Sequence, residues 1–183
     1  MPTIDDEKMT FIHIPKTAGA SITRWYSKNI LKNKTGYYKP SLSEHIFLSE
    51  IENPAPITIA VVRNPWDRVV SMYTFAKNCK EFEFLSENFS VFVLYQIYFY
   101  SLGKYTLSTP QIRWIEPGVT HLLRFENLEQ DFKIIQDIFQ CYEPLPMWNK
   151  TNHYHYRTYY NDETRQAVSE MFKEDIEAFG YEF

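Results

Sequence analysis

Two short polar segments of the chain carry the residue types that bind phosphate or sulfate groups. The first combines one cation, two hydroxyls and a run of small residues: Lys16, Thr17, Ala18, Gly19, Ala20 and Ser21. Small residues let backbone N–H groups approach an anion, and a helix that starts here would direct its positive end to the same point. The segment therefore predicts an anion cradle. It is not a Walker A loop, because Lys16 precedes the segment's glycine. The alternative to an anion cradle is a plain strand-to-helix turn.

The second polar segment begins at Arg63 and ends at Ser71, eight residues further on. An arginine binds phosphate through charge-assisted hydrogen bonds that can be bidentate. Asn64, Pro65 and Asp67 suit the cap, the first position and the third position of a helix, which would carry Ser71 about two turns along. The segment predicts a second phosphate contact, and a capped helix with surface charges is the alternative.

These segments need a frame that brings them together. Apolar runs rich in β-branched residues predict three strands, near residues 9–14, 57–62 and 119–124. Helical spacing of apolar side chains predicts the helices, over residues 20–31, from 65 to about 76, 88–102, 126–141 and 161–179, with a shorter stretch near 42–51. Alternation of this kind predicts a parallel sheet, and ligands bind at the carboxyl ends of its strands. Both polar segments directly follow a predicted strand.

The predicted fold class is α/β, with a P-loop-like central parallel sheet, helices on both faces and a single domain over residues 1–183. The length fits one domain, and 44% hydrophobic with 23% charged residues is ordinary globular usage. A net charge of −4 argues against a nucleic-acid partner. No apolar run approaches the length of a membrane span, and no signal peptide is visible. Cys79 and Cys141 form no Cys-x-x-Cys pair, so a cytoplasmic, reducing location is expected.

Positive charge is concentrated near the first segment. Between Lys8 and Ser43 the chain has seven basic residues and no acidic one. The run is consistent with a solvated basic face or with a site for a polyanionic ligand.

The two segments resemble the nucleotide-binding motifs of sulfotransferases that use 3′-phosphoadenosine 5′-phosphosulfate (PAPS). Residues 11–22 resemble their 5′-phosphosulfate loop, and residues 62–73 resemble their 3′-phosphate motif. The similarity is closest to the carbohydrate branch with the heparan sulfate 2-O- and 6-O-sulfotransferases. It continues through residues 123–128 to the ending 175–183, and so covers nearly the whole chain.

The resemblance implies a role for each motif. It assigns the 5′-phosphosulfate to residues 16–21, through the Lys16 ammonium, backbone N–H groups and two hydroxyls. It assigns the 3′-phosphate to Arg63 and Ser71. Lys16 would also neutralise charge that develops on the bridging oxygen as the S–O bond breaks. Residues 149–152 resemble, more loosely, a loop near the nucleotide. No metal is expected.

An acceptor hydroxyl needs a base, and the resemblance places His45 at the position of the family's catalytic histidine. An imidazole suits general-base work at neutral pH. Glu44 is the alternative base, and a surface histidine without a role is the other interpretation. His13 and His121 fall in predicted strands and are expected to be structural. The His-x-His pair at residues 153–155 has no third metal ligand at fitting spacing.

The sequence thus predicts a PAPS-dependent sulfotransferase that acts on the hydroxyl of a small-molecule or glycan acceptor, and the resemblance favours a carbohydrate. A non-catalytic relative that binds a nucleotide or a glycan is the first alternative, and a small-molecule kinase is the second. The aromatic stretch at residues 89–105 suits core packing or sugar stacking. Oligomeric state, acceptor identity and regiochemistry are left open.

Overall fold

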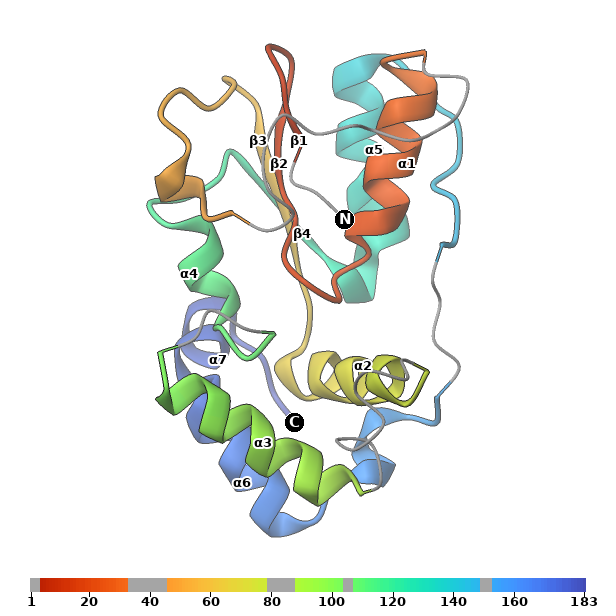
Figure 1. Cartoon of the computed structure of the whole chain (residues 1–183). Coiled ribbons are helices and arrows are strands. Elements are labelled where there is room, and N and C mark those ends of the chain that lie inside the picture. The colour runs from red at the N-terminus through yellow and green to blue at the C-terminus, as the bar shows by residue number, and fades with distance from the viewer. Residues whose placement is uncertain (1–3, 33–45, 79–87, 104–106, 149–152) are drawn as a thin grey trace. The chain divides into compact units, whose positions relative to one another are not determined.

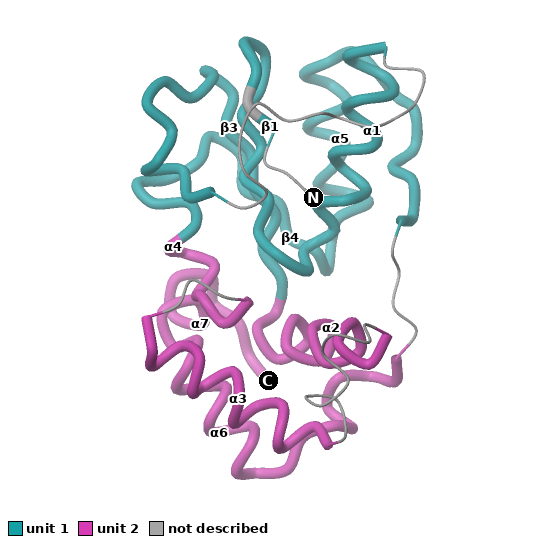
Figure 2. Tube along the Cα trace, in the orientation of Figure 1, with its two compact units in different colours: residues 1–63, 114–150 teal, residues 64–113, 151–183 magenta. Residues whose placement is uncertain are grey.

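The computed structural model describes residues 4–32, 46–78, 88–103, 107–148 and 153–183. The chain divides into two compact units (Figure 2). Unit 1 comprises residues 1–63 and 114–150, and unit 2 comprises residues 64–113 and 151–183. That residues 1–183 form a single domain stays a prediction.

Unit 1 is built on a four-stranded sheet in the order β1-β2-β3-β4. The strands are β1 (Ile4–Asp5), β2 (Thr10–Ile12), β3 (Thr58–Val62) and β4 (His121–Arg124). The three predicted strands are confirmed, and they pair in parallel. β1 was not predicted; it is two residues long and pairs antiparallel with β2. The predicted α/β class with a parallel sheet is therefore confirmed.

The register of the sheet brings three strand ends to one edge. Ile12 pairs with Ala60, and Val62 pairs with Arg124. The residues that follow β2, β3 and β4 consequently emerge at the same side of unit 1. This is the edge at which the two polar segments were expected to meet.

Two helices, α1 (Gly19–Asn29) and α5 (Leu128–Phe139), lie on one side of this sheet (Figure 1). Trp25 of α1 meets Phe132 of α5 edge-on at 4.9 Å between ring centroids, and both side chains are buried in the core of the unit. The segment with the 3₁₀ turn η1 (Leu48–Glu50) lies on the other side in Figure 1. Helices on both faces of the sheet stay a prediction.

Unit 2 is helical in its described residues. It contains α2 (Pro65–Lys77), α3 (Phe89–Ser101), the 3₁₀ turn η4 (Tyr156–Tyr159), α6 (Asp162–Met171) and α7 (Lys173–Phe179). The short α4 (Gln111–Ile115) begins in unit 2 and ends in unit 1, and the 3₁₀ turn η3 (Phe125–Asn127) follows β4. No helix among the described residues is long and apolar enough to cross a membrane.

The helix predicted over residues 161–179 is wrong in one respect, because it breaks at Phe172. That residue has φ −111° and ψ 27°, outside helical values, and its side chain is fully buried. α7 then starts afresh and ends at Gly180, whose φ of 64° is the left-handed conformation expected of a glycine C-cap.

A buried polar network fixes α2 and α7 within unit 2. The fully buried Arg68 of α2 donates hydrogen bonds to the carbonyls of Leu107 and Thr109. The fully buried carboxylate of Asp175 accepts from the backbone N–H groups of Gln111 and Ile112. Burial raises the pKa of Asp175, while the Arg68 charge and these hydrogen bonds oppose the increase. The network joins three segments that are distant in sequence.

Candidate functional site

The loop between β2 and α1 is the first part of the candidate site. Lys16 and Ala18 both have left-handed backbone conformations, with φ of 70° and 65°. Such values cost a residue with a Cβ roughly 1–2 kcal/mol. Ala18 is the N-cap of α1 and offers no side-chain cap. In the described part of the chain the backbone N–H groups of Gly19 and Ala20 have no hydrogen-bond partner. The loop therefore presents helix N-terminal donors to an external anion.

Gly19 is required by close packing rather than by backbone conformation. A Cβ at this position would overlap the imidazole ring of His13, the residue directly after β2. His13 is almost fully buried, which fits the structural role expected of it. The ring and the missing Cβ together set how closely the start of α1 approaches the strand.

The two hydroxyls of the loop have different surroundings. Thr17 is fully buried, and its hydroxyl donates to the carbonyl of Ile14 at 2.9 Å. That hydrogen bond closes the loop, so its proton is already used. Ser21 accepts a hydrogen bond from the Trp148 backbone N–H at 3.1 Å, and so its own proton can still be donated.

Segment 143–148 is held along α1 by this contact and two others. The indole N–H of Trp25 donates to the Glu143 carbonyl at 2.7 Å. The guanidinium of Arg24 lies 3.9 Å from the centroid of the Trp148 ring. Sequence reasoning did not identify Arg24 or Trp148 as neighbours of the loop, because only folding brings these positions together.

Arg63 is the second part of the site and follows β3 directly. Its side chain is only 6% exposed, and its Nη1 donates to the Lys16 carbonyl at 3.1 Å. The guanidinium lies 4.0 Å from the centroid of the Phe125 ring, which comes from the turn after β4. All three parallel strands thus contribute to one edge. Phe125 was missed as a site residue, and its place immediately after a predicted strand was the available signal.

For several predicted residues, membership of this group stays a prediction. Ser71 is buried in α2 of unit 2, and its grouping with the loop stays a prediction. His45 and Glu44 lie outside the described residues, as does the loop 149–152. Among the residues that are described, no cluster of three or more histidine, cysteine or carboxylate side chains could hold a metal ion.

The arrangement in unit 1 can bind an anion of high charge density. Helix N-terminal N–H groups, a loop lysine and a buried arginine converge on one sheet edge, and the first turn of α1 contains no acidic residue. Open α/β sheets bind their ligands at the carboxyl ends of the strands, and a helix N-terminus at such an edge favours an anion.

Comparison with known proteins identifies the family. The family model of the sulfotransferase domain matches residues 27–143, more than half of the chain. The chain therefore belongs to the sulfotransferase family, whose members transfer sulfuryl groups and generally use PAPS as donor. The matched range includes Arg63 and Ser71 but begins after the loop at residues 15–21. Searches among curated proteins and among solved structures found no match.

Proposed function

We propose that this protein transfers the sulfuryl group of PAPS to an acceptor hydroxyl, with a carbohydrate as the acceptor. The observation that carries the donor assignment is the hydrogen bond from Arg63 to the Lys16 carbonyl. It joins the two segments to which the resemblance assigns the 5′-phosphosulfate and the 3′-phosphate. The carbohydrate acceptor is supported by the resemblance of residues 11–22 and 62–73 to the carbohydrate branch.

The donor groups in the loop fit the 5′-phosphosulfate. The N–H groups of Gly19 and Ala20, the Ser21 hydroxyl and the Lys16 ammonium would hold its oxygens. The Thr17 hydroxyl would not donate to the 5′-phosphosulfate as the sequence suggested, because its proton is already donated to the Ile14 carbonyl. Thr17 would contribute its backbone, and its side chain would maintain the shape of the loop.

Arg63 would hold the 3′-phosphate, with Ser71 as the second contact that the resemblance assigns. The stack on Phe125 and the hydrogen bond to Lys16 fix two sides of the guanidinium before a ligand arrives. A group fixed in this way loses little conformational freedom on binding, which favours affinity.

PAPS supplies an activated sulfuryl group attached to a phosphate leaving group. The protein's part is positioning and charge stabilisation, as in phosphoryl transfer. The Lys16 ammonium would neutralise charge on the oxygen released from sulfur. His45, with Glu44 as the alternative, would take the proton of the acceptor hydroxyl as its oxygen bonds to sulfur. The products are the sulfated acceptor and adenosine 3′,5′-bisphosphate.

The test is thermal unfolding with adenosine 3′,5′-bisphosphate, compared with ADP and Mg²⁺. A ligand at 100 times its Kd stabilises the folded state by about 2.7 kcal/mol. We expect a shift with the bisphosphate that is lost in Arg63→Ala and Lys16→Ala. Lys28→Ala, an exposed lysine on α1, is the matched control and should keep the shift. A shift with Mg-ADP alone would overturn the proposal in favour of a kinase.

Turnover separates the enzyme from a non-catalytic relative. If the bisphosphate binds, His45→Ala should retain binding and lose transfer of sulfate from PAPS to a hydroxyl acceptor. Full activity in His45→Ala would reject His45 as the base, and Glu44→Ala would then be the next variant. Binding without transfer to any acceptor would favour the non-catalytic alternative.

A further inference from the structure

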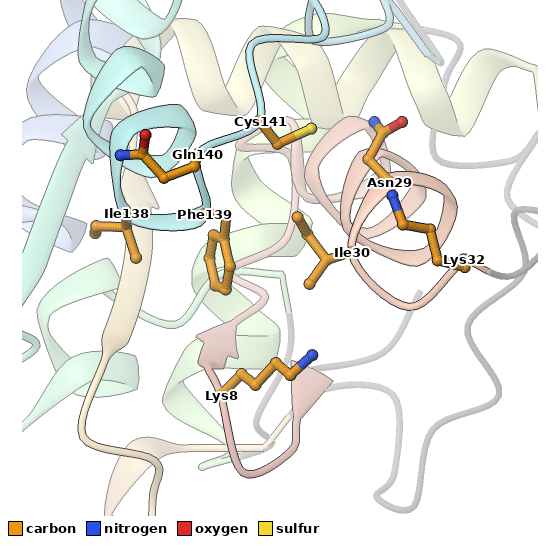
Figure 3. A pocket seen from close by; sticks show the side chains of 8 residues that line it. All are labelled: Lys8, Asn29, Ile30, Lys32, Ile138, Phe139, Gln140 and Cys141. Carbon is orange, nitrogen blue, oxygen red and sulfur yellow. The ribbon is translucent and has the colours of Figure 1, made fainter.

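A pocket in unit 1 lies away from the candidate site. It has a volume of about 460 Å³ and lies where the C-terminal ends of α1 and α5 meet the turn between β1 and β2 (Figure 3). The candidate site follows the carboxyl end of β2 and the N-terminus of α1. The pocket lies at the opposite ends of both elements, so it belongs to a different edge of the unit.

Two lysines give the pocket its charge. Lys8 comes from the turn between the strands, and Lys32 lies just after α1. No acidic residue lines the pocket, and within the described part of the chain neither ammonium has an ion-pair partner. Each helix C-terminus carries about −0.5 charge, so the two helix ends offset about half of the two positive charges. The net positive charge that remains is about one, which suits a ligand with a single negative charge.

The walls of the pocket are apolar. Ile30, Ile138 and Phe139 line it, and Figure 3 shows Lys8 extending toward Ile30 and Phe139. Phe139 is fixed by an edge-on contact with the buried Tyr26, at 5.4 Å between ring centroids. A fixed apolar wall beside lysines suits a ligand with an apolar body and a charged end. The volume is within the range of small-molecule sites.

Backbone conformation also distinguishes the pocket. Lys32 and Gln140 have φ of 55° and 48°, in the left-handed region that glycine adopts most easily. Both side chains line the pocket. At both positions a side chain that lines the pocket stands where glycine would relieve backbone strain. Backbone strain of this kind is concentrated at functional positions.

We propose that this pocket binds a small amphipathic monoanion, with an aromatic or aliphatic body and one sulfonate, sulfate or carboxylate group. The lysines recognise the charge, and Ile30, Ile138 and Phe139 contact the body. The site goes beyond the proposed transfer of sulfate and does not depend on PAPS.

Cys141 provides a direct readout, because it lines the pocket and its thiol is half-buried. The experiment uses the full chain with Cys79→Ser, which leaves Cys141 as the remaining cysteine. The rate of Cys141 alkylation is measured against increasing 2-naphthalenesulfonate. We expect 2-naphthalenesulfonate to protect Cys141 in a saturable way. Inorganic sulfate and uncharged 2-naphthol should need at least fivefold higher concentrations for half-maximal protection.

The lysines are tested with a matched control. In the double variant Lys8→Gln with Lys32→Gln, the 2-naphthalenesulfonate concentration that gives half-maximal protection should rise at least fivefold. Lys28→Gln should leave it unchanged, since this exposed lysine does not line the pocket. Circular dichroism confirms that each variant is folded. Absence of saturable protection, equal protection by 2-naphthol, or equal weakening in Lys28→Gln would each overturn the proposal. All measurements omit PAPS, so failure of the proposed transfer reaction would not affect them.

Discussion

The helices α1 and α2 begin in opposite ways. α2 is capped by Asn64, whose side chain accepts from the N–H groups of Trp66 and Asp67, and Asp67 adds a carboxylate to its first turn. α1 begins at the left-handed Ala18, with no side-chain cap and no acidic residue in its first turn. A helix end that its own side chains satisfy adds stability. A helix end without such a cap can satisfy its N–H donors with a bound anion. The start of α2 therefore adds stability, and the start of α1 is suited to binding.

The largest effect is expected from breaking the buried network that holds α2. Asp175→Ala removes the carboxylate near the buried Arg68 and leaves the N–H groups of Gln111 and Ile112 without their acceptor. Each buried N–H group left without an acceptor costs about 1–3 kcal/mol, so losing both acceptors should cost several kcal/mol. Urea unfolding should show a loss of this size, against a change below about 1 kcal/mol for the exposed Glu177→Ala. Equal losses would show that the network adds nothing.

Gly19→Ala tests the open end of α1 through packing. The added Cβ meets the His13 ring, and overpacking of this kind costs about 1–3 kcal/mol. Affinity for adenosine 3′,5′-bisphosphate should also fall, because the loop must shift. Gly180→Ala is the matched control: its Cβ meets nothing, so it should cost about 1 kcal/mol for its backbone conformation and leave affinity unchanged. Unaltered calorimetric affinity in Gly19→Ala would contradict the assignment.

Ala20→Asp would make α1 begin as α2 does. A carboxylate in the first turn stabilises a helix by about 0.3–1 kcal/mol, yet it would repel an incoming anion. We expect bisphosphate affinity to fall about tenfold, equivalent to about 1.4 kcal/mol, without loss of thermal stability. Ala167→Asp on α6 of unit 2 is the charge-matched control for affinity. Undiminished binding in Ala20→Asp would show that the anion binds elsewhere.

Asn64→Ala should change stability by a smaller amount. Loss of the cap costs about 1 kcal/mol, and the hydrogen bond from Asn64 to the Glu182 carbonyl is lost as well. Asn161→Ala removes the comparable cap of α6, which accepts from the Thr164 N–H. Denaturant titration of both variants tests whether Asn64 has the larger effect. A smaller loss for Asn64 would mean that the second contact contributes nothing.

The smallest effect concerns Glu174, in the first turn of α7. Its hydrogen bonds with Arg113 lower the pKa of this carboxyl below its ordinary value of 4.5. The stability it contributes is therefore present above that value and is lost as pH falls through the lower folded-state pKa. Both groups are exposed, so Glu174→Gln should cost at most about 1 kcal/mol at pH 7. The free energy of unfolding of the wild type and of Glu174→Gln, measured from pH 7 to pH 2, should become equal at the acid end.

Local sequence signals predicted the parts of the fold that local physics determines. The β-branched run at residues 57–62 became β3, and Asn64 capped α2 as its residue type suggested. The break at Phe172 and the edge strand β1 were missed. Phe172 continues the apolar helical spacing and is buried like the rest of the stripe, so no local signal marks the break between α6 and α7.

The candidate site was predictable in position but not in detail. Parallel strands and two polar segments sufficed to place Lys16 and Arg63 at one edge. The commitment of the Thr17 hydroxyl to Ile14 and the stack of Arg63 on Phe125 depend on tertiary packing, which spacing along the chain does not encode. The same holds for the overlap between His13 and a Cβ at residue 19.

The contact between Trp148 and Ser21 gives the protein an intrinsic optical reporter. Three of its four tryptophans are at most 4% exposed, whereas Trp148 is 43% exposed and its backbone N–H is bonded to the Ser21 hydroxyl. Excitation at the red edge of indole absorption favours this solvent-facing ring, which lies against the Arg24 guanidinium. Fluorescence from the unlabelled protein can therefore follow events at the start of α1 in real time.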